Sequence, residues 1–175
     1  MRLMPNKSAP CHEDKMQRQV ADYFSQRRFA PSNWNGFHDS MIIPKIYREV
    51  SISRIGRISD IIIYITNKKI INIECKMEGY EMVIMQAIDH LKWADYSYVC
   101  LFADTYLPAY AIDKMVANGI GLLLWKPEIF VEVIQSGYNK NKEKTIHDSV
   151  VKLLKKKESI KTGMTELKQQ IDLKI

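Results

Sequence analysis

Three residues in one short passage of the chain could together carry out metal-dependent chemistry: Asp60, Glu74 and Lys76. Carboxylate oxygens are the ligands that Mg²⁺ prefers, and one or two of them suffice beside water and phosphate. The backbone carbonyl of Cys75 could be a further ligand. A lysine beside such a cation could orient an attacking water or stabilise the charge that builds up on a phosphate. These side chains therefore predict hydrolysis of a phosphodiester, provided that the fold brings them together.

Two strands, expected at Ile58–Thr66 and Ile70–Lys76, would position these side chains. Alternate residues of a strand point to the same side of a sheet. Asp60, Glu74 and Lys76 then share one face of the strand pair. The opposite face is apolar and is expected to belong to the core; it consists of Ile61, Ile63, Ile65, Ile71, Ile73 and Cys75.

The turn between the two strands decides whether their apolar faces coincide. A one-residue shift moves every side chain of a strand to the other side of the sheet, so only a turn with an odd number of residues keeps the apolar sets together. Thr66–Lys68 and Asn67–Lys69 both satisfy this condition. Either turn leaves Asp60 opposite Glu74 or Lys76, at about 8 Å or less.

The passage resembles the PD-(D/E)xK nuclease superfamily, whose mark is an acid, a spacer and then D/E-x-K at the end of the next strand. Here the acid is Asp60, thirteen residues intervene, and the triplet is Glu74-Cys75-Lys76. Gly56-Arg57 is similar to a G-R-x-D style found in many members, whereas Ser59 replaces the nominal proline. The resemblance covers roughly residues 11–103. It implies a metal-dependent nuclease with Mg²⁺ or Mn²⁺ as its cofactor.

The resemblance also implies roles for residues outside the central passage. Members usually carry another acid upstream; we favour Glu49, in the first expected strand, and hold Glu13, in the first expected helix, as the alternative. Several relatives carry Q-x-x-x-Y on the next helix, where this chain has Gln86 and, in place of tyrosine, His90. We expect Gln86 to serve catalysis, and His90 and Arg57 to contact nucleic acid.

The order of elements favours an α/β fold with a central mixed sheet flanked by helices. A strand–helix–strand step favours parallel pairing, whereas short turns join antiparallel strands. The order agrees with the α-β-β-β-α-β core of the restriction-endonuclease-like fold that the resemblance implies. The expected helices are Cys11–Arg28, Glu78–Ala94, Pro108–Asn118 and His147–Lys157, and the expected strands are Tyr47–Ile55, Ile58–Thr66, Ile70–Lys76, Tyr96–Phe102, Ile120–Trp125 and Ile129–Ile134.

The positive charge of the chain is concentrated at its C-terminal end. Residues 138–175 hold ten lysines and five acidic residues, while the net charge of the whole chain is +6. We therefore expect a nuclease-like domain over 1–137 and a lysine-rich helical extension over 138–175. A polyanion fits this pattern, so nucleic acid, DNA before RNA, is the expected partner of Lys155, Lys156 and Lys157. A solvated lysine-rich helix face is the other interpretation.

Several other classes of protein are not indicated. The three cysteines are scattered and form no CxxC pair, which argues against a zinc ribbon, an iron–sulfur cluster and a disulfide scaffold. No secretory signal is visible, and the apolar runs are far too short to span a bilayer. We expect a cytoplasmic protein without a membrane partner, and a homodimer is compatible with the sequence. A catalytically inactive nuclease-like module that binds nucleic acid or a partner protein is the alternative function.

Overall fold

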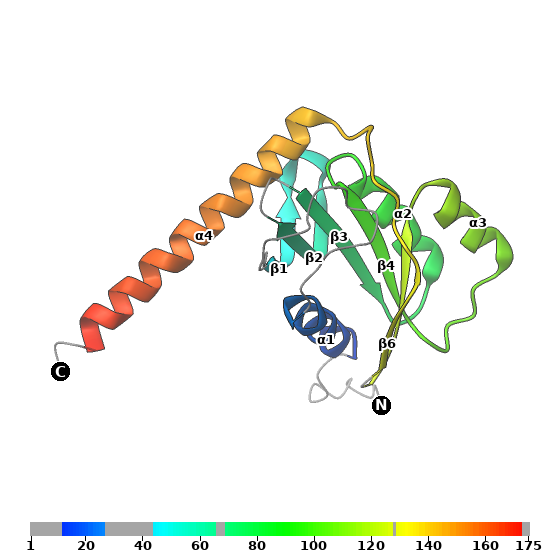
Figure 1. The fold of residues 1–175 in the computed structure, drawn as a ribbon, viewed down its shortest axis with the longest axis horizontal. Helices are drawn as coiled ribbons and strands as arrows, with labels where there is room; N and C mark the ends of the chain where they lie inside the picture. The colour runs from blue at the N-terminus through cyan, green and yellow to red at the C-terminus, as the bar shows by residue number, and fades with distance from the viewer. Residues whose placement is uncertain (1–11, 27–43, 66–68, 128, 173–175) are drawn as a thin grey trace, which may run out of the picture.

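The chain forms a six-stranded sheet with helices on both faces (Figure 1). The structure, a computed structural model, describes residues 12–26, 44–65, 69–127 and 129–172. The strand order is β1-β2-β3-β4-β5-β6, which is also the order along the chain. The elements are α1 (His12–Gln26), β1 (Lys45–Ile52), the 3₁₀ turn η1 (Ser53–Ile55), β2 (Arg57–Ile65), β3 (Lys69–Lys76), α2 (Tyr80–His90), β4 (Tyr96–Phe102), α3 (Ala109–Ala117), β5 (Gly121–Lys126), β6 (Ile129–Ile134) and α4 (Lys144–Asp172).

The sheet is mixed, as the sequence predicts. Strands β1, β2 and β3 pair antiparallel, β3, β4 and β5 pair parallel, and β6 returns antiparallel to β5. The two parallel steps each contain a helix, and both crossovers lie on the same face because such connections are right-handed. Helices α2 and α3 therefore cover β4 and β5 together, around a cluster that includes Val83, Ala87, Met115 and Leu122.

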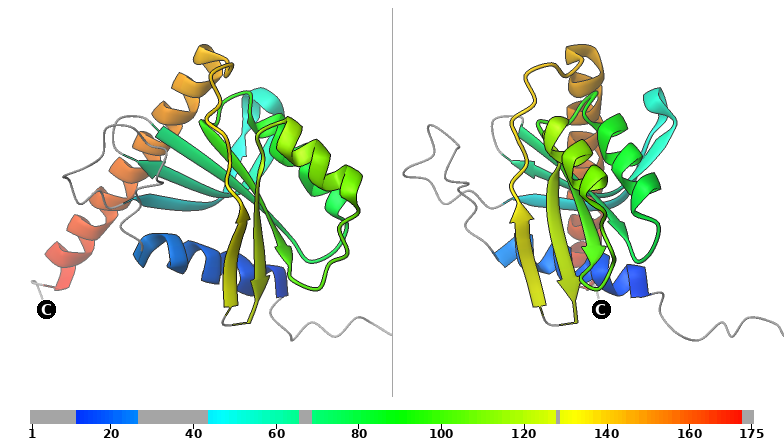
Figure 2. Two further views of the ribbon diagram at one scale, coloured as in Figure 1. Left: turned by 45° about the vertical axis from the view of Figure 1, so that its right-hand side comes forward. Right: turned by 90° about the vertical axis from the view of Figure 1, so that its right-hand side faces the viewer.

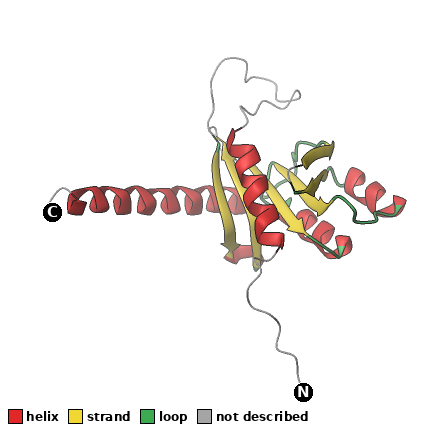
Figure 3. Cartoon of the chain, turned by 90° about the horizontal axis from the view of Figure 1, so that it is seen from below, coloured by secondary structure: helices red, strands yellow, loops and turns green. Residues whose placement is uncertain are grey.

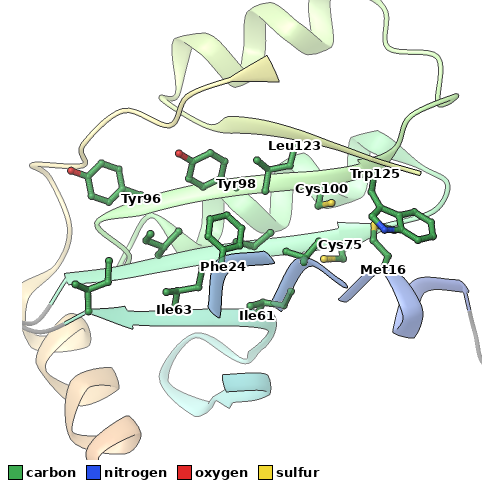
Figure 4. Packing of buried hydrophobic residues seen from close by; sticks show 14 residues of the cluster. Met16, Phe24, Ile61, Ile63, Cys75, Tyr96, Tyr98, Cys100, Leu123 and Trp125 are labelled. Carbon is green, nitrogen blue, oxygen red and sulfur yellow. The ribbon is translucent and has the colours of Figure 1, made fainter. Parts of the chain in front are cut away.

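The register of β2 and β3 confirms that the turn between them is odd. Ile61 pairs with Ile73 and Ile65 with Lys69, which corresponds to the Thr66–Lys68 turn, although those three residues lie outside the described part. All six residues of the predicted apolar face are buried under α1. Figure 4 shows this core, in which Met16 and Phe24 of α1 pack near Ile61, Ile63 and Cys75.

The other face of β2 is also covered, and α4 contributes to that cover. Val150, Val151 and Leu154 form one cluster with Ile62 and Tyr64 of β2 and with neighbouring buried residues. The first half of the predicted extension therefore belongs to the core of the domain. The helix is also longer than predicted, and its distal part projects away from the sheet (Figures 1 and 3).

Two predicted elements, the first strand and the helix after β3, are shorter in the structure than predicted. The first strand ends at Ile52, because Ser53–Ile55 form a 3₁₀ turn that Gly56 closes at φ 63°. Helix α2 begins after Gly79, whose φ is 81°, and its last residue is His90. Within the described residues, no helix is both long and apolar enough to cross a membrane.

Candidate active site at the end of β3

Asp60 is fixed directly against the Glu74-Cys75-Lys76 triplet. It lies near the start of β2, one position beyond the Ile61–Ile73 pair, so it is opposite the end of β3. Its Oδ2 atom accepts a hydrogen bond of 2.8 Å from the backbone N–H of Cys75. The predicted juxtaposition of Asp60 with the triplet is therefore present in the fold.

Glu74 is buried between β3 and α2, next to His90. The side chain of Glu74 is 1% exposed and that of His90 0%, and the His90 Nε2 atom lies 3.1 Å from Oε1 of Glu74. The two atoms are close, but their directions do not match a regular hydrogen bond, and both are buried without another partner. Buried polar atoms are nearly always paired, so the Oε1 atom of Glu74 is an unused acceptor within the site.

A ladder of polar side chains fixes the strands behind Glu74. The Ser59 hydroxyl bonds to the Asn72 side-chain oxygen, and Asn72 Nδ2 donates to Ser97 Oγ at 3.2 Å. Ser97 Oγ in turn donates to the carbonyl of Ala87 in α2, at 2.9 Å. The residue in place of the nominal proline, Ser59, thus begins a chain of contacts that joins β2, β3, β4 and α2.

Lys76 points to α1, where it meets the second of the two candidate upstream acids. Its Nζ atom lies 3.1 Å from Oε2 and 3.3 Å from Oε1 of Glu13. The neighbouring Asp14 pairs with Arg48 of β1, so two consecutive acids hold the first turn of α1 at the edge of the site. The structure thus brings Glu13 into the constellation.

Glu49, the acid that we favoured, is placed differently. It falls between the Arg48–Ile61 and Val50–Ser59 pairs, at the register position opposite Asp60. Its φ is 50°, which is uncommon for a residue with a side chain and interrupts the ladder. The residue is exposed, whereas Glu13 contacts Lys76, so of the two candidate acids Glu13 is the one that pairs with a residue of the triplet.

The site carries more negative than positive charge. Glu13, Asp60 and Glu74 have acidic side chains, and Lys76 is the basic residue that lies beside them. The pKa of Asp60 is raised to about 7, mainly by burial and next by the charge of Glu74, while the hydrogen bond from the Cys75 N–H opposes the rise. The charge of Glu13 also raises this pKa and Lys76 lowers it. Such crowding would be relieved by a proton or by a cation.

The residues fit a hydrated Mg²⁺ or Mn²⁺ better than a zinc-type cage. Asp60 and Glu74 offer carboxylate oxygens, and Oε1 of Glu74 is buried without a well-aligned hydrogen bond. No group of three or more His, Cys, Asp or Glu side chains suited to a metal is present in the described ranges. Mg²⁺ needs only one or two carboxylates. The thiol of Cys75 lies in the core beside Cys100, so only its backbone carbonyl is available to a metal.

His90 does not occupy the place that we predicted for it. We expected it to contact nucleic acid, but it is completely buried. Its Nδ1 atom accepts the indole N–H of Trp93 at 3.0 Å, and Nε2 faces Glu74. The spacing of Val83, Ala87 and His90 along α2 predicts this burial, because residues four and then three positions apart share one face of a helix.

The remaining predicted residues lie on α2, at the start of β2 and on α4. Gln86 is half-buried on α2, one turn before His90. Arg57, at the start of β2, donates to Oδ2 of Asp89 from Nη2 at 2.8 Å and from Nε at 3.1 Å. Lys155, Lys156 and Lys157 are exposed on α4.

A hollow with a basic rim lies between η1 and α4. Its volume is about 290 Å³, and its cationic lining residues are Arg54, Lys152 and Lys156. Arg54 belongs to the turn that leads into β2, whose residues Arg57 and Asp60 follow. Arg54 therefore lies just before the start of β2, and Asp60 lies near that same start.

Comparison with known proteins adds information on the fold alone. No family model and no curated protein matches the sequence. A solved structure, that of the SPO1766 protein of unknown function from Silicibacter pomeroyi, is similar with a TM-score of 0.51. The match covers 68% of this chain and 77% of that chain at 15% sequence identity. At this identity the likeness extends to the α/β architecture and not to the activity.

Proposed function

We propose that the chain is a metal-dependent nuclease of the PD-(D/E)xK type, with a restriction-endonuclease-like core, that hydrolyses phosphodiester bonds of DNA. One observation carries the proposal: the Cys75 N–H fixes the carboxyl of Asp60 at 2.8 Å beside the buried Glu74, an arrangement in which the pKa of Asp60 is raised to about 7. Two carboxylates that are buried side by side repel each other and destabilise the folded protein. The same pair, next to Lys76, is suited to binding a divalent cation. The helix–three strands–helix–strand order around them supports the same assignment.

In this proposal, Asp60 and Glu74 hold Mg²⁺ or Mn²⁺, with the carbonyl of Cys75 as a further ligand. When bound, the cation supplies a water of lowered pKa and positive charge at the scissile phosphate. Lys76 donates hydrogen bonds that orient the attacking water or a phosphate oxygen. Glu13 keeps the Nζ atom of Lys76 at the site through their 3.1 Å contact. The ring of His90 lies against the buried Oε1 atom of Glu74.

The basic hollow between η1 and α4 gives the substrate a place to extend. Arg54, Lys152 and Lys156 would neutralise phosphates of the backbone on one side of the acidic cluster. Such contacts are independent of sequence and depend strongly on salt. Arg57 lies between Arg54 of the hollow and Asp60 along the chain. It would contact a phosphate nearer to the scissile bond, and this contact would replace its ion pair with Asp89.

The test is a cleavage assay with the purified full chain. Linear duplex DNA, circular plasmid, single-stranded DNA and RNA are each incubated with Mg²⁺, Mn²⁺ or EDTA. Lys76→Ala is compared with Lys126→Ala, because Lys126 also pairs with an acid and is similarly exposed, at 42% against 38%. We expect cutting that requires the metal, is lost in Lys76→Ala and is kept in Lys126→Ala.

One result of the same assay would contradict the proposal. Absence of cutting on all four substrates, with no rise in melting temperature on addition of Mn²⁺, would exclude the nuclease. The non-catalytic module that binds nucleic acid or a partner protein would then replace it. Cutting of RNA alone would keep the chemistry and change the substrate.

A further inference from the structure

The turn that follows α2 is held by a segment from much later in the chain. The carbonyl groups at the end of a helix have no partner within the helix and need one elsewhere. Here four consecutive carbonyl groups accept hydrogen bonds from one segment: those of Leu91 and Ala94 from the Asn139 side chain, that of Lys92 from the Glu143 N–H, and that of Trp93 from the His147 ring. We call residues 139–147 the α2 cap. Figure 2 shows this part of the chain leading from β6 to the start of α4.

One bond of the α2 cap leads to the candidate active site. The Nδ1 atom of His147 lies 2.8 Å from the Trp93 carbonyl oxygen, which can only accept, so this nitrogen carries the proton. The indole N–H of Trp93 donates to Nδ1 of His90 at 3.0 Å, and the centroids of the two rings are 5.2 Å apart, edge to face. The Nε2 atom of the same His90 ring lies 3.1 Å from Oε1 of Glu74. Three contacts therefore connect the first turn of α4 with a carboxylate of the site.

Burial gives these contacts a single arrangement. Glu74, His90, Trp93 and His147 are 1%, 0%, 0% and 6% exposed, so solvent does not replace a partner that is lost. The hydrogen bond at one ring nitrogen of a histidine decides which nitrogen carries the proton. With the indole N–H at Nδ1, the neutral His90 ring keeps its proton on Nε2, beside Glu74. Without the indole in place, this proton would be free to move to Nδ1 and the ring free to turn.

We propose that His147 is a positioning residue of the candidate active site. By holding the Trp93 carbonyl it keeps the indole on His90, and through this ring it keeps an N–H beside Glu74. The inference rests on the proposed function, in which Glu74 is a metal ligand. Residues that orient a metal ligand typically contribute about 10- to 100-fold to metal affinity. The start of α4 acts on metal binding through one such residue, His90.

The competing role for His147 is packing alone. Its ring is buried in the first turn of a helix that packs on β2, so a smaller side chain would loosen that helix even if the hydrogen bond had no effect on the site. Two substitutions separate the roles. His147→Phe keeps a ring and removes the donor, whereas His147→Asn keeps an N–H near the position of Nδ1 and gives up most of the ring. A positioning role makes the phenylalanine variant the weaker metal binder, and a packing role the asparagine variant.

The experiment is a calorimetric titration of the full chain with Mn²⁺, at a temperature below the melting of every variant. We expect His147→Phe to lower the affinity by about tenfold, the lower end of the range for residues next to a ligand, and His147→Asn to stay close to the wild type. In a His90→Leu background His147→Phe should cause no further loss, because it acts through the missing ring. Leu154→Ala is the matched control: it also lies buried on α4, and it carries no polar group.

A second measurement needs no metal. Exchange of the Trp93 indole hydrogen with water, followed by NMR, should be faster in His147→Phe than in the wild type and unchanged in His147→Asn. Melting curves check folding, and His147→Leu takes the place of His147→Phe if the larger ring does not fit. The opposite order of the two variants, or a loss from His147→Phe that persists in full without the His90 ring, would overturn this inference alone. A wild-type chain that binds no Mn²⁺ would contradict the proposed function, and this inference with it.

Discussion

The Nε2 atom of His90 lies 3.1 Å from the Oε1 atom of Glu74, between the end of β3 and helix α2. The Nδ1 atom of the same ring accepts a hydrogen bond from Trp93, so the proton of the neutral ring is on Nε2. The ring therefore holds its N–H donor within 3.1 Å of a carboxylate that we propose as a metal ligand, although the two groups are not aligned as a regular hydrogen bond. Loss of a second residue that orients a metal ligand typically lowers metal affinity by about 10- to 100-fold.

Removal of this donor should weaken metal binding before it affects folding. We expect His90→Leu to lower the affinity for Mn²⁺ by about 10- to 100-fold, measured by calorimetric titration. His90→Gln, which keeps a donor, should lose less. Trp93→Phe removes the group that fixes the tautomer and should shift the affinity in the same direction. Equal Mn²⁺ affinity in the wild type and His90→Leu would show that the ring only fills space.

The raised pKa of Asp60 predicts how stability depends on pH without metal. The folded value is about 7 and the ordinary value 3.8, so the folded state holds a proton that the unfolded state has lost between these values. The stability from neutral Asp60 is present below pH 4 and is lost as the pH rises through 7, by about 4 kcal/mol at most. Asp60→Asn should therefore raise the melting temperature at pH 8 and not at pH 4.

The same proton should compete with the metal. Because a cation binds the ionised carboxyl, the affinity of the wild type for Mn²⁺ should fall by up to about tenfold for each pH unit below 7. Asp60→Asn should bind Mn²⁺ weakly at every pH. The measurement is a series of Mn²⁺ titrations between pH 5 and 8 with EDTA-treated protein. A wild-type affinity that does not change over this range would contradict the coupling.

The contact between Glu13 and Lys76 predicts which upstream acid matters. Glu13→Gln removes the partner of Lys76 and a charge close to Asp60, so we expect cleavage to fall by about 100-fold. Glu49→Gln changes an exposed residue and should stay within about threefold of the wild type. Single-turnover cleavage with saturating Mg²⁺ separates the two. The reverse order of effects would restore Glu49 as the upstream acid.

The strands and their pairing could be predicted from the sequence because alternate residues of a strand lie on the same face of the sheet. The set Ile61, Ile63 and Ile65 matches an apolar set on the next strand only if the turn is odd, and the observed Ile65–Lys69 pair agrees. Once that register is fixed, Asp60 must lie opposite the end of β3. Local pattern thus predicted the centre of the candidate site.

The periphery of the site depends on contacts that no local pattern contains. Glu13 and Lys76 are 63 positions apart and meet only because α1 crosses under β3. The favoured Glu49 lies at the register position opposite Asp60 with a φ of 50°, a backbone angle that the strand-like sequence around it does not indicate. His90 was expected to be accessible because its side chain is polar, whereas the buried positions one and two turns earlier on α2 show that this face of the helix is internal.

The lysines of α4 should differ in their effect on DNA binding according to the helix face that they occupy. Lys152 and Lys156 line the hollow beside Arg54, whereas Lys155 and Lys157 are exposed elsewhere on the helix and do not line it. Each phosphate contact contributes about 0.9 to the slope of log affinity against log salt concentration. We expect Lys152→Ala with Lys156→Ala to reduce this slope by about 1 to 2, and Lys155→Ala with Lys157→Ala to change it little. Both pairs remove the same charge, so fluorescence anisotropy of labelled duplex DNA in EDTA compares placement at constant net charge. Equal losses from the two pairs would mean that the helix attracts DNA through its total charge, and that the hollow is not where the backbone binds.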